Sequence, residues 1–501
     1  MAGARVAAAH ADAPLVLALD LGSSSVRAVL FDSSGRMVEG SLAAEGYVWT
    51  MPEPGAAEAD PDDLVERLFR CIDRVLASAG PLAGRIVGVA ATTMVTNVLG
   101  VGAHGRAVTP LYPYTDDRSE PDAAQLRQEA DDAAIHNRTG CHLHTSYLPP
   151  RFRWLARTQP SRFRKARKWM SIGEYLFLRL FRQSPVSFSV ASWSGLLDRS
   201  RLIWDPGVFA LLPVRIDQFS PLIDQDQAVT HLEEAFASRW PALRDVPWFP
   251  AIGDGAAANV GSGCLSPRRM ALSVGTSAAI RVITADPAEH LPQALFCYRL
   301  DRSRSILGGA LTEGGNVFGW MTTTMRLGDT DPLEQALATM APDSHGLTVL
   351  PFFSGERSPG WSSRARATLH GLSLRTTAID ILRAGLEAVA LRLALVYEEM
   401  RKVDAESGEL VASGSAVLNS PAWLQIIADA LGAPVIASGV TEASARGAAL
   451  LALEALGELT DVGQAPAYLG EIYEPDTARH ARYREALERQ RALYRALIQQ
   501  P

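Results

Sequence analysis

Two apolar stretches of the chain share the same hydrophobic pattern, although they lie half a chain apart. Each has an apolar strand, a turn of glycine and small hydroxyl residues, and a second apolar strand; the two copies are Leu17–Leu30 and Met270–Ile283. Such a pattern predicts a β-hairpin, and the glycine in its turn, Gly22 or Gly275, lets the backbone approach another molecule closely. The repeat predicts two related halves that hold a ligand, such as a phosphate, between their turns.

The first half continues with the pattern of an α/β domain. After the hairpin, Asp32–Arg36 predicts a tight turn, and Met37–Tyr47 returns as a third strand. Acidic residues and a proline at 59–63 precede the apolar-periodic segment Leu64–Ala77, which predicts a helix. The next buried strand is Ile86–Ala91. This order of strands and helix is typical of an actin-like, ribonuclease-H-like domain.

The second half repeats that order. The helix expected at Ala443–Leu456 is rich in small residues, which fits tight packing against a sheet. A charged amphipathic helix at Asp476–Gln500 is expected to act as a lid. The expected elements are strands within Met270–Thr284 and Leu295–Leu311, a long helix at Thr376–Met400, a strand at Glu409–Ala412, a helix at Pro421–Leu431 capped by Ser420, and a helix at Ala443–Leu456.

The patterns together predict an α/β fold of two actin-like domains with an interdomain cleft. We expect residues 1–14 to be a disordered leader and residues 15–250 to form the N-terminal domain. The segment from Arg118 to Pro250 has no counterpart in the second half and is expected to be an insertion on the substrate side. Residues 251–501 are expected to form the C-terminal, nucleotide-binding domain.

Composition narrows the class of protein. A chain of 501 residues, 47% hydrophobic and 21% charged, can form two sizeable domains. A net charge of -7 disfavours a general nucleic-acid binder, and the basic run 162–168 fits a solvated helix face. The four cysteines form no Cys-x-x-Cys pair, which favours a reducing cytoplasm, and no apolar run reaches membrane-spanning length. Oligomeric state stays open, with a homodimer as one alternative.

One carboxylate ends the first strand of the first hairpin. Asp20 directly precedes a turn that carries exposed backbone N–H groups and the hydroxyls of Ser23, Ser24 and Ser25. Mg²⁺ commonly uses one or two protein carboxylates together with phosphate oxygens, so Asp20 can hold a hydrated magnesium. Arg27 adds a cation for the phosphates. A strand-end aspartate without a ligand is the alternative, and the second copy of the hairpin weighs against it.

A second carboxylate lies between two glycines. Asp254 precedes a small-residue run that can start a helix. Transfer of a phosphoryl group to a sugar hydroxyl needs a base to accept the hydroxyl proton, and a carboxylate at a helix N-terminus can serve. A simple helix-capping aspartate is an equal alternative.

Several separated motifs, in the right order, resemble the FGGY family of carbohydrate kinases over nearly the whole chain. Besides the two hairpins and Gly253-Asp-Gly255, these are Leu350-Pro-Phe-Phe-Ser-Gly-Glu-Arg-Ser-Pro359, Gly371-Leu-Ser373 and Ser413-Gly-Ser-Ala416. Within the family the chain looks most like the gluconokinase branch. That likeness rests on Thr139–His144, Ile172–Leu176, Ser189–Ser192, Phe296–Tyr298 and Tyr114–Ser119.

The resemblance implies an ATP-dependent and Mg²⁺-dependent kinase with Asp254 as its general base. It places Ser23, Ser24, Ser25 and Arg27 at the ATP phosphates, Asp20 near magnesium, Gly275 and Thr276 in the second phosphate turn, Gly315 and Gly319 along the nucleotide site, and Gly414 and Asn419 near adenosine. The sugar-contact candidates are Met94, Asp116, Arg118 and His144, with Arg118 facing a sugar-acid carboxylate or forming a loop salt bridge. Glu356 and Arg357 are either catalytic or a buried ion pair.

The chain also departs from the pattern of its relatives. Val95 stands where many have His, Ser187 where gluconokinases tend to have Asp, and Thr312-Glu313 where they tend to have paired Asn. The adenosine loop is Ser413-Gly-Ser instead of three glycines. Because these changes fall mainly at expected substrate contacts, we expect catalysis to be retained while the sugar stays open.

Gluconate is the first choice of acceptor, and a ketose or pentitol of the xylulose or ribulose type is second. An ATP-gated actin-like binding protein and a catalytically silent sugar sensor are the alternatives from other classes. The two catalytic carboxylates, Asp20 and Asp254, weigh against the sensor.

Overall fold

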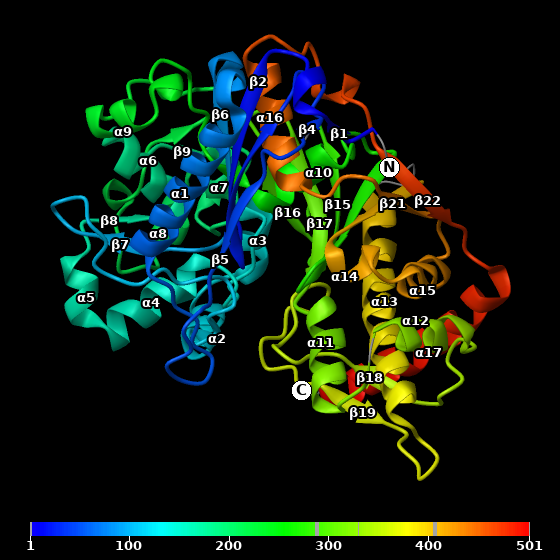
Figure 1. Ribbon diagram of the computed structural model, residues 1–501. Helices are drawn as coiled ribbons and strands as arrows, with labels where there is room; N and C mark the ends of the chain where they lie inside the picture. Colours follow the sequence, from blue (N-terminus) through cyan, green and yellow to red (C-terminus); the bar gives the residue numbers. More distant parts are fainter. Residues whose placement is uncertain (1–2, 286–289, 329, 404–407, 500–501) are drawn as a thin grey trace.

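The computed structural model describes residues 3–285, 290–328, 330–403 and 408–499 (Figure 1). Two α/β lobes lie side by side, and each is built on a seven-stranded sheet. In both sheets an antiparallel hairpin pairs with a parallel strand from later in its own half of the chain. The expected α/β fold of two actin-like domains is confirmed.

The N-terminal sheet is centred on the first hairpin. β2 and β3 are antiparallel, with Asp20 directly opposite Arg27, and β6 runs parallel to β2. The segment expected as one third strand forms two short strands, β4 and β5, that both pair with β3. The bounds are β2 (Leu15–Leu21), β3 (Ser25–Phe31), β4 (Met37–Val38), β5 (Ala43–Gly46), β6 (Ile86–Thr93) and β13 (Ile252–Gly253).

The expectation of a disordered leader is wrong for residues 3–14. β1 (Arg5–Val6) pairs in parallel with β4 and extends the first sheet. Val6 and Ala11 are buried in the hydrophobic core of this lobe. Two apolar side chains in an alanine-rich segment give too weak a periodic signal to reveal an edge strand, because its stability comes from pairing with a distant partner.

Helix α1 (Pro61–Ala79) forms where the sequence predicts it. Asp60 accepts a hydrogen bond from the Asp62 N–H, and Pro61 occupies the first turn. Its apolar face, which includes Leu68 and Phe69, is buried against the first sheet. The helix therefore supports the strands whose turn reaches the cleft.

The insertion forms a mostly helical layer beside the first sheet, with an aromatic core of its own. It contains α2 (Glu120–Glu129), α3 (Asp132–Thr139), α4 (Leu148–Thr158), α5 (Pro160–Lys165), α6 (Ile172–Phe181), α7 (Phe188–Ser192), α8 (Pro206–Phe209) and α9 (Glu234–Arg239). Two short strand pairs lie within it, β9 (Val186–Ser187) with β12 (Leu222–Ile223) and β10 (Leu197–Asp198) with β11 (Ile203–Trp204). A third of its strands, β8 (Lys168–Met170), pairs with β7 (Leu99–Val101), which precedes the insertion.

The C-terminal sheet repeats the arrangement around the second hairpin. It has the strand order β16, β17, β15, β14, β20, β21, β22. Its strands are β14 (Arg269–Val274), β15 (Ala278–Thr284), β16 (Phe296–Arg299), β17 (Ser305–Leu311), β20 (Glu409–Ser413), β21 (Val435–Ser438) and β22 (Leu469–Tyr473), with a separate pair β18 (Thr348–Leu350) and β19 (Thr368–His370). Its helices are α11 (Gly315–Thr324), α12 (Thr330–Thr339), α13 (Ala378–Val403), α14 (Ser415–Leu418), α15 (Pro421–Leu431) and α17 (Thr477–Leu497).

Helix α17 belongs to the C-terminal lobe and does not act as the expected lid. Tyr483 and Leu487 are buried in the main core of this lobe, and the Tyr494 hydroxyl donates to Glu356. Gln500, at the end of the predicted helix, lies outside the described residues. None of the described helices combines the length and the apolar character needed to cross a bilayer.

Two helices tie the C-terminal half to the first sheet. α10 (Asp254–Gly261) directly follows β13, and β13 pairs with β6. α16 (Ala443–Ala455), orange in Figure 1, packs on α10 and on the blue strands β2 and β6. The first lobe therefore extends beyond the boundary expected at residue 250, and Asp254 belongs to it.

Candidate active site

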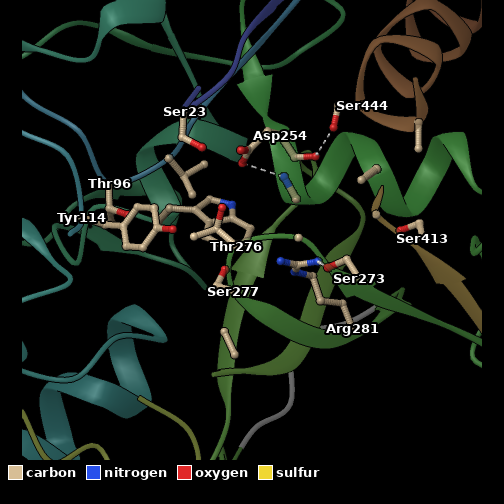
Figure 2. A pocket seen from close by; sticks show the side chains of 18 of the residues that line it. Ser23, Thr96, Tyr114, Asp254, Ser273, Thr276, Ser277, Arg281, Ser413 and Ser444 are labelled. Atoms are coloured by element: carbon tan, nitrogen blue, oxygen red, sulfur yellow. Dashed lines mark hydrogen bonds between the residues drawn. The ribbon is translucent and has the colours of Figure 1, made fainter. Parts of the chain in front are cut away.

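A cavity of about 310 Å³ lies between the lobes, and both hairpin turns line it (Figure 2). Its walls also include the N-terminal ends of α10 and α16 and the loop before α14. Of the residues expected to bind nucleotide or metal or to act as base, it is lined by Ser23, Arg27, Asp254, Gly275, Thr276 and Gly414. The fold thus brings residues from four distant parts of the chain to one place.

The first turn is held from outside by two aromatic side chains. The Tyr47 hydroxyl donates to the Gly22 carbonyl at 2.7 Å, and the Trp49 indole N–H donates to the Ser23 carbonyl at 2.8 Å. Ser23 and Ser24 are exposed and Ser25 is partly buried. Because both carbonyls are engaged, the turn keeps a fixed shape with the Ser23 side chain at the cavity. No sequence motif indicates Tyr47 and Trp49, since their hydrogen-bond partners are backbone atoms.

Asp20 lies buried beneath Arg27 and is 3% exposed. One carboxylate oxygen accepts from the Arg27 guanidinium at 3.0 Å, and the other accepts from the Thr92 hydroxyl at 2.7 Å. Burial raises the pKa of Asp20, and the charge of Arg27 opposes that rise. Arg27 also forms an ion pair with Glu442, next to the start of α16, at 3.5 Å. Asp20 is therefore a rigid carboxylate just behind the cavity wall.

Three glycines lie at or beside the second turn. The Gly275 N–H donates to the Ser277 carbonyl at 2.9 Å, and the Gly315 N–H donates to the Gly275 carbonyl at 2.7 Å. A Cβ on Gly275 would meet no atom within 4 Å, so this glycine faces open space. A Cβ on Gly414, whose φ is +98°, would lie 2.3 Å from the Val274 carbonyl oxygen. Gly414 is thus needed for close backbone packing, and Gly275 keeps the cavity open.

Asp254 is the first residue of α10, on the opposite side of the cavity from the second turn (Figure 2). Its carboxylate accepts from the Gly255 N–H at 2.8 Å, and its carbonyl accepts from the Ser444 hydroxyl at 3.2 Å. Burial and the negative charge of Asp20 raise the pKa of Asp254 to about 6, while Arg281 opposes the rise. A carboxylate with this pKa is ionised at neutral pH and basic enough to accept a proton.

Two further cations, neither predicted from the sequence to bind a ligand phosphate or carboxylate, line the cavity. Arg281 of β15 donates to the Ser273 hydroxyl at 2.9 Å, and Figure 2 shows its guanidinium turned toward the second turn. Arg357 also lines the cavity and lies over the Tyr114 ring, 5.3 Å from its centroid. The sequence held a signal for Arg281, because it is the one charged residue in β15.

The expected ion pair between Glu356 and Arg357 does not form. Glu356 instead binds Arg392 and the Tyr494 hydroxyl inside the C-terminal lobe. Arg357 donates to the Leu311 carbonyl. The two neighbours therefore face different surroundings, one in the core and the other at the cavity.

The structure places the four sugar-contact candidates away from the cavity wall. Arg118 forms ion pairs with Asp116 at 2.6 Å, Glu58 at 2.7 Å and Glu53 at 2.9 Å, which is the salt-bridge alternative. Asp116 is 1% exposed, and Met94 and His144 are also buried. The residues from these segments that do line the cavity are Val95, Thr96, Tyr114, Ser146 and Tyr147. In each of these loops the residues that line the cavity are thus neighbours of the candidates.

Three expected nucleotide-site residues lie near the second turn without lining the cavity. The Gly315 N–H donates a hydrogen bond to the Gly275 carbonyl. Gly319 follows one turn later in α11, with open space beside it, and Asn419 is the C-cap of the short helix α14. Of the three, Gly315 contacts the second turn directly, through its hydrogen bond to Gly275.

The fold and the cavity define a two-lobed phosphotransferase of actin-like architecture. Comparison with protein families agrees: the N-terminal domain of the FGGY family of carbohydrate kinases matches residues 15–261, and the C-terminal domain matches residues 270–456. The chain belongs to the FGGY family of carbohydrate kinases and is a carbohydrate kinase.

Individual relatives have different acceptors in their names. The chain is 26% identical over 470 residues to a gluconokinase of Bacillus subtilis (strain 168), covering 91% of each chain. It is 29% identical to a glycerol kinase of Aromatoleum aromaticum, covering 95% of this chain and 98% of the relative. A crystal structure of a xylulose kinase from Lactobacillus acidophilus has the same fold, with a TM-score of 0.87, 23% identity, and coverage of 96% of this chain and 98% of the other.

Proposed function

We propose that this kinase transfers the γ-phosphoryl group of ATP to a hydroxyl group of a sugar acid, with gluconate as the first choice. The observation that carries the chemistry is Asp254, a carboxylate with a pKa of about 6 on the wall of a cavity that both phosphate-type turns line. The choice of gluconate is supported by the motifs shared with gluconokinases and by the B. subtilis relative.

The chain's own residues supply a base, a phosphate cradle and positive charge. The acceptor oxygen attacks the γ-phosphorus, the bond from that phosphorus to the bridging oxygen breaks, and ADP leaves. Asp254 accepts the proton of the attacking hydroxyl. The two turns hold the phosphates, with the Ser23 and Thr276 side chains at the cavity, and Arg27 offsets negative charge. Closure of the lobes excludes water that would otherwise hydrolyse ATP.

The residues present fit a magnesium ion. Asp20 and Asp254 lie close enough for the charge of Asp20 to raise the pKa of Asp254, and a divalent cation near both would relieve that repulsion. Among the described residues no group of three His, Cys, Asp or Glu side chains gathers as a metal site. Mg²⁺ keeps several waters and needs only one or two protein carboxylates. Asp20 would hold the hydrated ion, which neutralises charge on the phosphates when bound.

A ketose or pentitol of the xylulose or ribulose type is the second candidate acceptor. One observation favours it: Val95, where many relatives have His, lines the cavity and makes that part of its wall apolar. A neutral acceptor with fewer hydroxyls fits such a wall more readily than one that needs a hydrogen bond there.

An acceptor panel tests the proposal. ADP release is followed with gluconate, other sugar acids, neutral sugars and polyols, and gluconate is expected to have the highest kcat/KM. Preference for xylulose or ribulose would establish the second candidate instead.

The base assignment has its own test. Asp254→Asn is expected to lower kcat by about 10²- to 10⁴-fold while calorimetry shows ATP binding retained. Asp245→Asn, at an exposed position, is the matched control and should behave as wild type. Full activity of Asp254→Asn would rule out this residue as the base.

A further inference from the structure

In the described part of the chain three arginines line the cavity, and Arg281 and Arg357 differ from the third, Arg27, in their partners. Arg27 has two carboxylate partners, Asp20 and Glu442. Within the described residues, Arg281 and Arg357 each donate to a neutral oxygen, on Ser273 and Leu311 respectively, and neither forms an ion pair. The Nε atoms of both are buried and have no hydrogen-bond partner.

Two unpaired guanidinium groups in one cavity are costly without an anion. Each is partly withdrawn from water, and a buried charge is tolerated mainly when it is paired and hydrogen-bonded. Burial lowers the pKa of Arg281 to about 10, and Asp254 opposes this fall. The charge of Arg357 lowers the pKa of Arg281 further, so the two guanidinium groups are close enough to repel each other. A ligand anion would remove both penalties.

The position of the pair shows which part of a ligand meets it. Arg281 lies beside α10: a Cβ built on Gly255 would be 3.2 Å from its guanidinium carbon. Arg357 lies beside Tyr114, on the part of the wall formed by the segment that leads into the insertion. The hydroxyls of Thr96, Tyr114 and Ser146 also line this side, as polar groups that suit a polyol chain. The pair thus extends from the base toward the acceptor side of the cavity.

We infer that Arg281 and Arg357 bind the carboxylate of the acceptor and select sugar acids over neutral sugars. This inference rests on the proposed function and assigns it specificity residues. Guanidinium groups suit the task, because their N–H groups match the two oxygens of a carboxylate. Arg118, which the sequence offered for this role, is already neutralised by three carboxylates.

Binding measurements without ATP test the inference independently of catalysis. The Kd for gluconate is measured by calorimetry for wild type, Arg281→Met, Arg357→Met and Arg357→Lys. Each Met variant is expected to weaken gluconate binding about 10- to 100-fold, the effect of losing a charged hydrogen bond. Arg357→Lys is expected to recover part of the loss. Arg215→Met, on the surface with a side chain 73% exposed, is the matched control.

Two further measurements show whether Arg281 and Arg357 bind the carboxylate of the acceptor or the phosphates of ATP. The ratio of kcat/KM for gluconate to that for glucitol, a neutral six-carbon polyol, is expected to fall in both Met variants, while the Kd for ATP stays within twofold of wild type. Loss of ATP affinity with an unchanged gluconate Kd would assign the pair to the phosphates and overturn the inference.

The two proposals fail in different ways. Wild-type enzyme that phosphorylates neutral sugars but neither binds nor phosphorylates any sugar acid would overturn the proposed function and the inference with it. Wild-type enzyme that prefers gluconate, together with Met variants that keep both gluconate affinity and the preference, would overturn the inference alone. Retained ATP binding in the variants shows that they are folded.

Discussion

Single side chains at the cavity owe their properties to what surrounds them. Asp254 is an ordinary carboxylate by sequence, but burial and the nearby charge of Asp20 make it a stronger base than an exposed aspartate. Arg281 shifts the same pKa in the other direction. The strength of the base thus depends on two charged side chains from two different hairpins.

The pKa of Asp254 predicts a pH dependence. The base must be ionised to accept a proton, so kcat/KM is expected to fall as the pH drops below about 6, by about tenfold per unit. The profile is recorded with the best acceptor, and circular dichroism confirms folding at each pH. A profile that stays flat down to the pKa of an exposed aspartate would show that the burial of Asp254 does not persist in solution.

The open space beside Gly275 predicts that a larger side chain at this position weakens ATP binding without affecting folding. Because a Cβ there meets open space, Gly275→Val should fold normally and fill part of the nucleotide site. Calorimetry is expected to show ATP binding weakened by about tenfold or more. Gly84→Val, exposed and equally unobstructed, is the control. Unchanged ATP affinity of Gly275→Val would contradict a nucleotide beside this turn.

At the scale of elements, the base is positioned by one close helix crossing. A Cβ on Gly261 of α10 would lie 1.8 Å from the Ala443 carbonyl oxygen, and one on Gly447 of α16 would lie 1.9 Å from the Ala257 carbonyl oxygen. The two helices therefore touch through their backbones. Since α16 also packs on β2 and β6, it fixes α10, and with it Asp254, against the first sheet.

Gly447→Ala tests this crossing. The added methyl group forces α10 and α16 apart, so we expect a loss of stability of about 1–3 kcal/mol and a fall in kcat because Asp254 moves with α10. Urea unfolding and steady-state kinetics measure the two effects. Gly408→Ala, which meets no atom within 4 Å, should change neither. Wild-type stability of Gly447→Ala would show that the helices can separate freely.

At the scale of the whole molecule, the site exists only because two lobes meet. The first lobe supplies Ser23, Arg27 and Asp254, and the second supplies Gly275 and Arg281. A ligand that contacts both sets is expected to draw the lobes together, because each lobe then gains contacts with the same molecule.

Small-angle X-ray scattering tests this closure. The radius of gyration is expected to fall when gluconate and a non-hydrolysable ATP analogue are both present, and to fall less with either one alone. Asp254→Asn should close in the same way, because the proton acceptor is not needed for binding. No change with both ligands bound would mean that the cavity already has its working shape.

Much of the fold could be predicted from the sequence because its signals are local. Alternating apolar residues, turn glycines and the caps Asp60 and Ser420 act over a few residues, and the structure confirms the hairpins, α1 and α15 where they predict them. The sequence did not predict β1, because a strand of two residues is too short to show alternating hydrophobic positions. Its pairing partner, β4, is also distant along the chain.

The sequence by itself determined the two α/β halves, the repeated turns, and the presence of Asp20 and Asp254. Only the tertiary structure decided which charged residues face the cavity. Arg118 follows two aspartates in the sequence, but two of its three carboxylate partners, Glu53 and Glu58, come from a distant segment. Arg281 instead meets a serine at the cavity wall. The physical reason is that a side chain's hydration and its ionic partners are set by contacts between segments far apart in the chain, which hydrophobic periodicity does not encode.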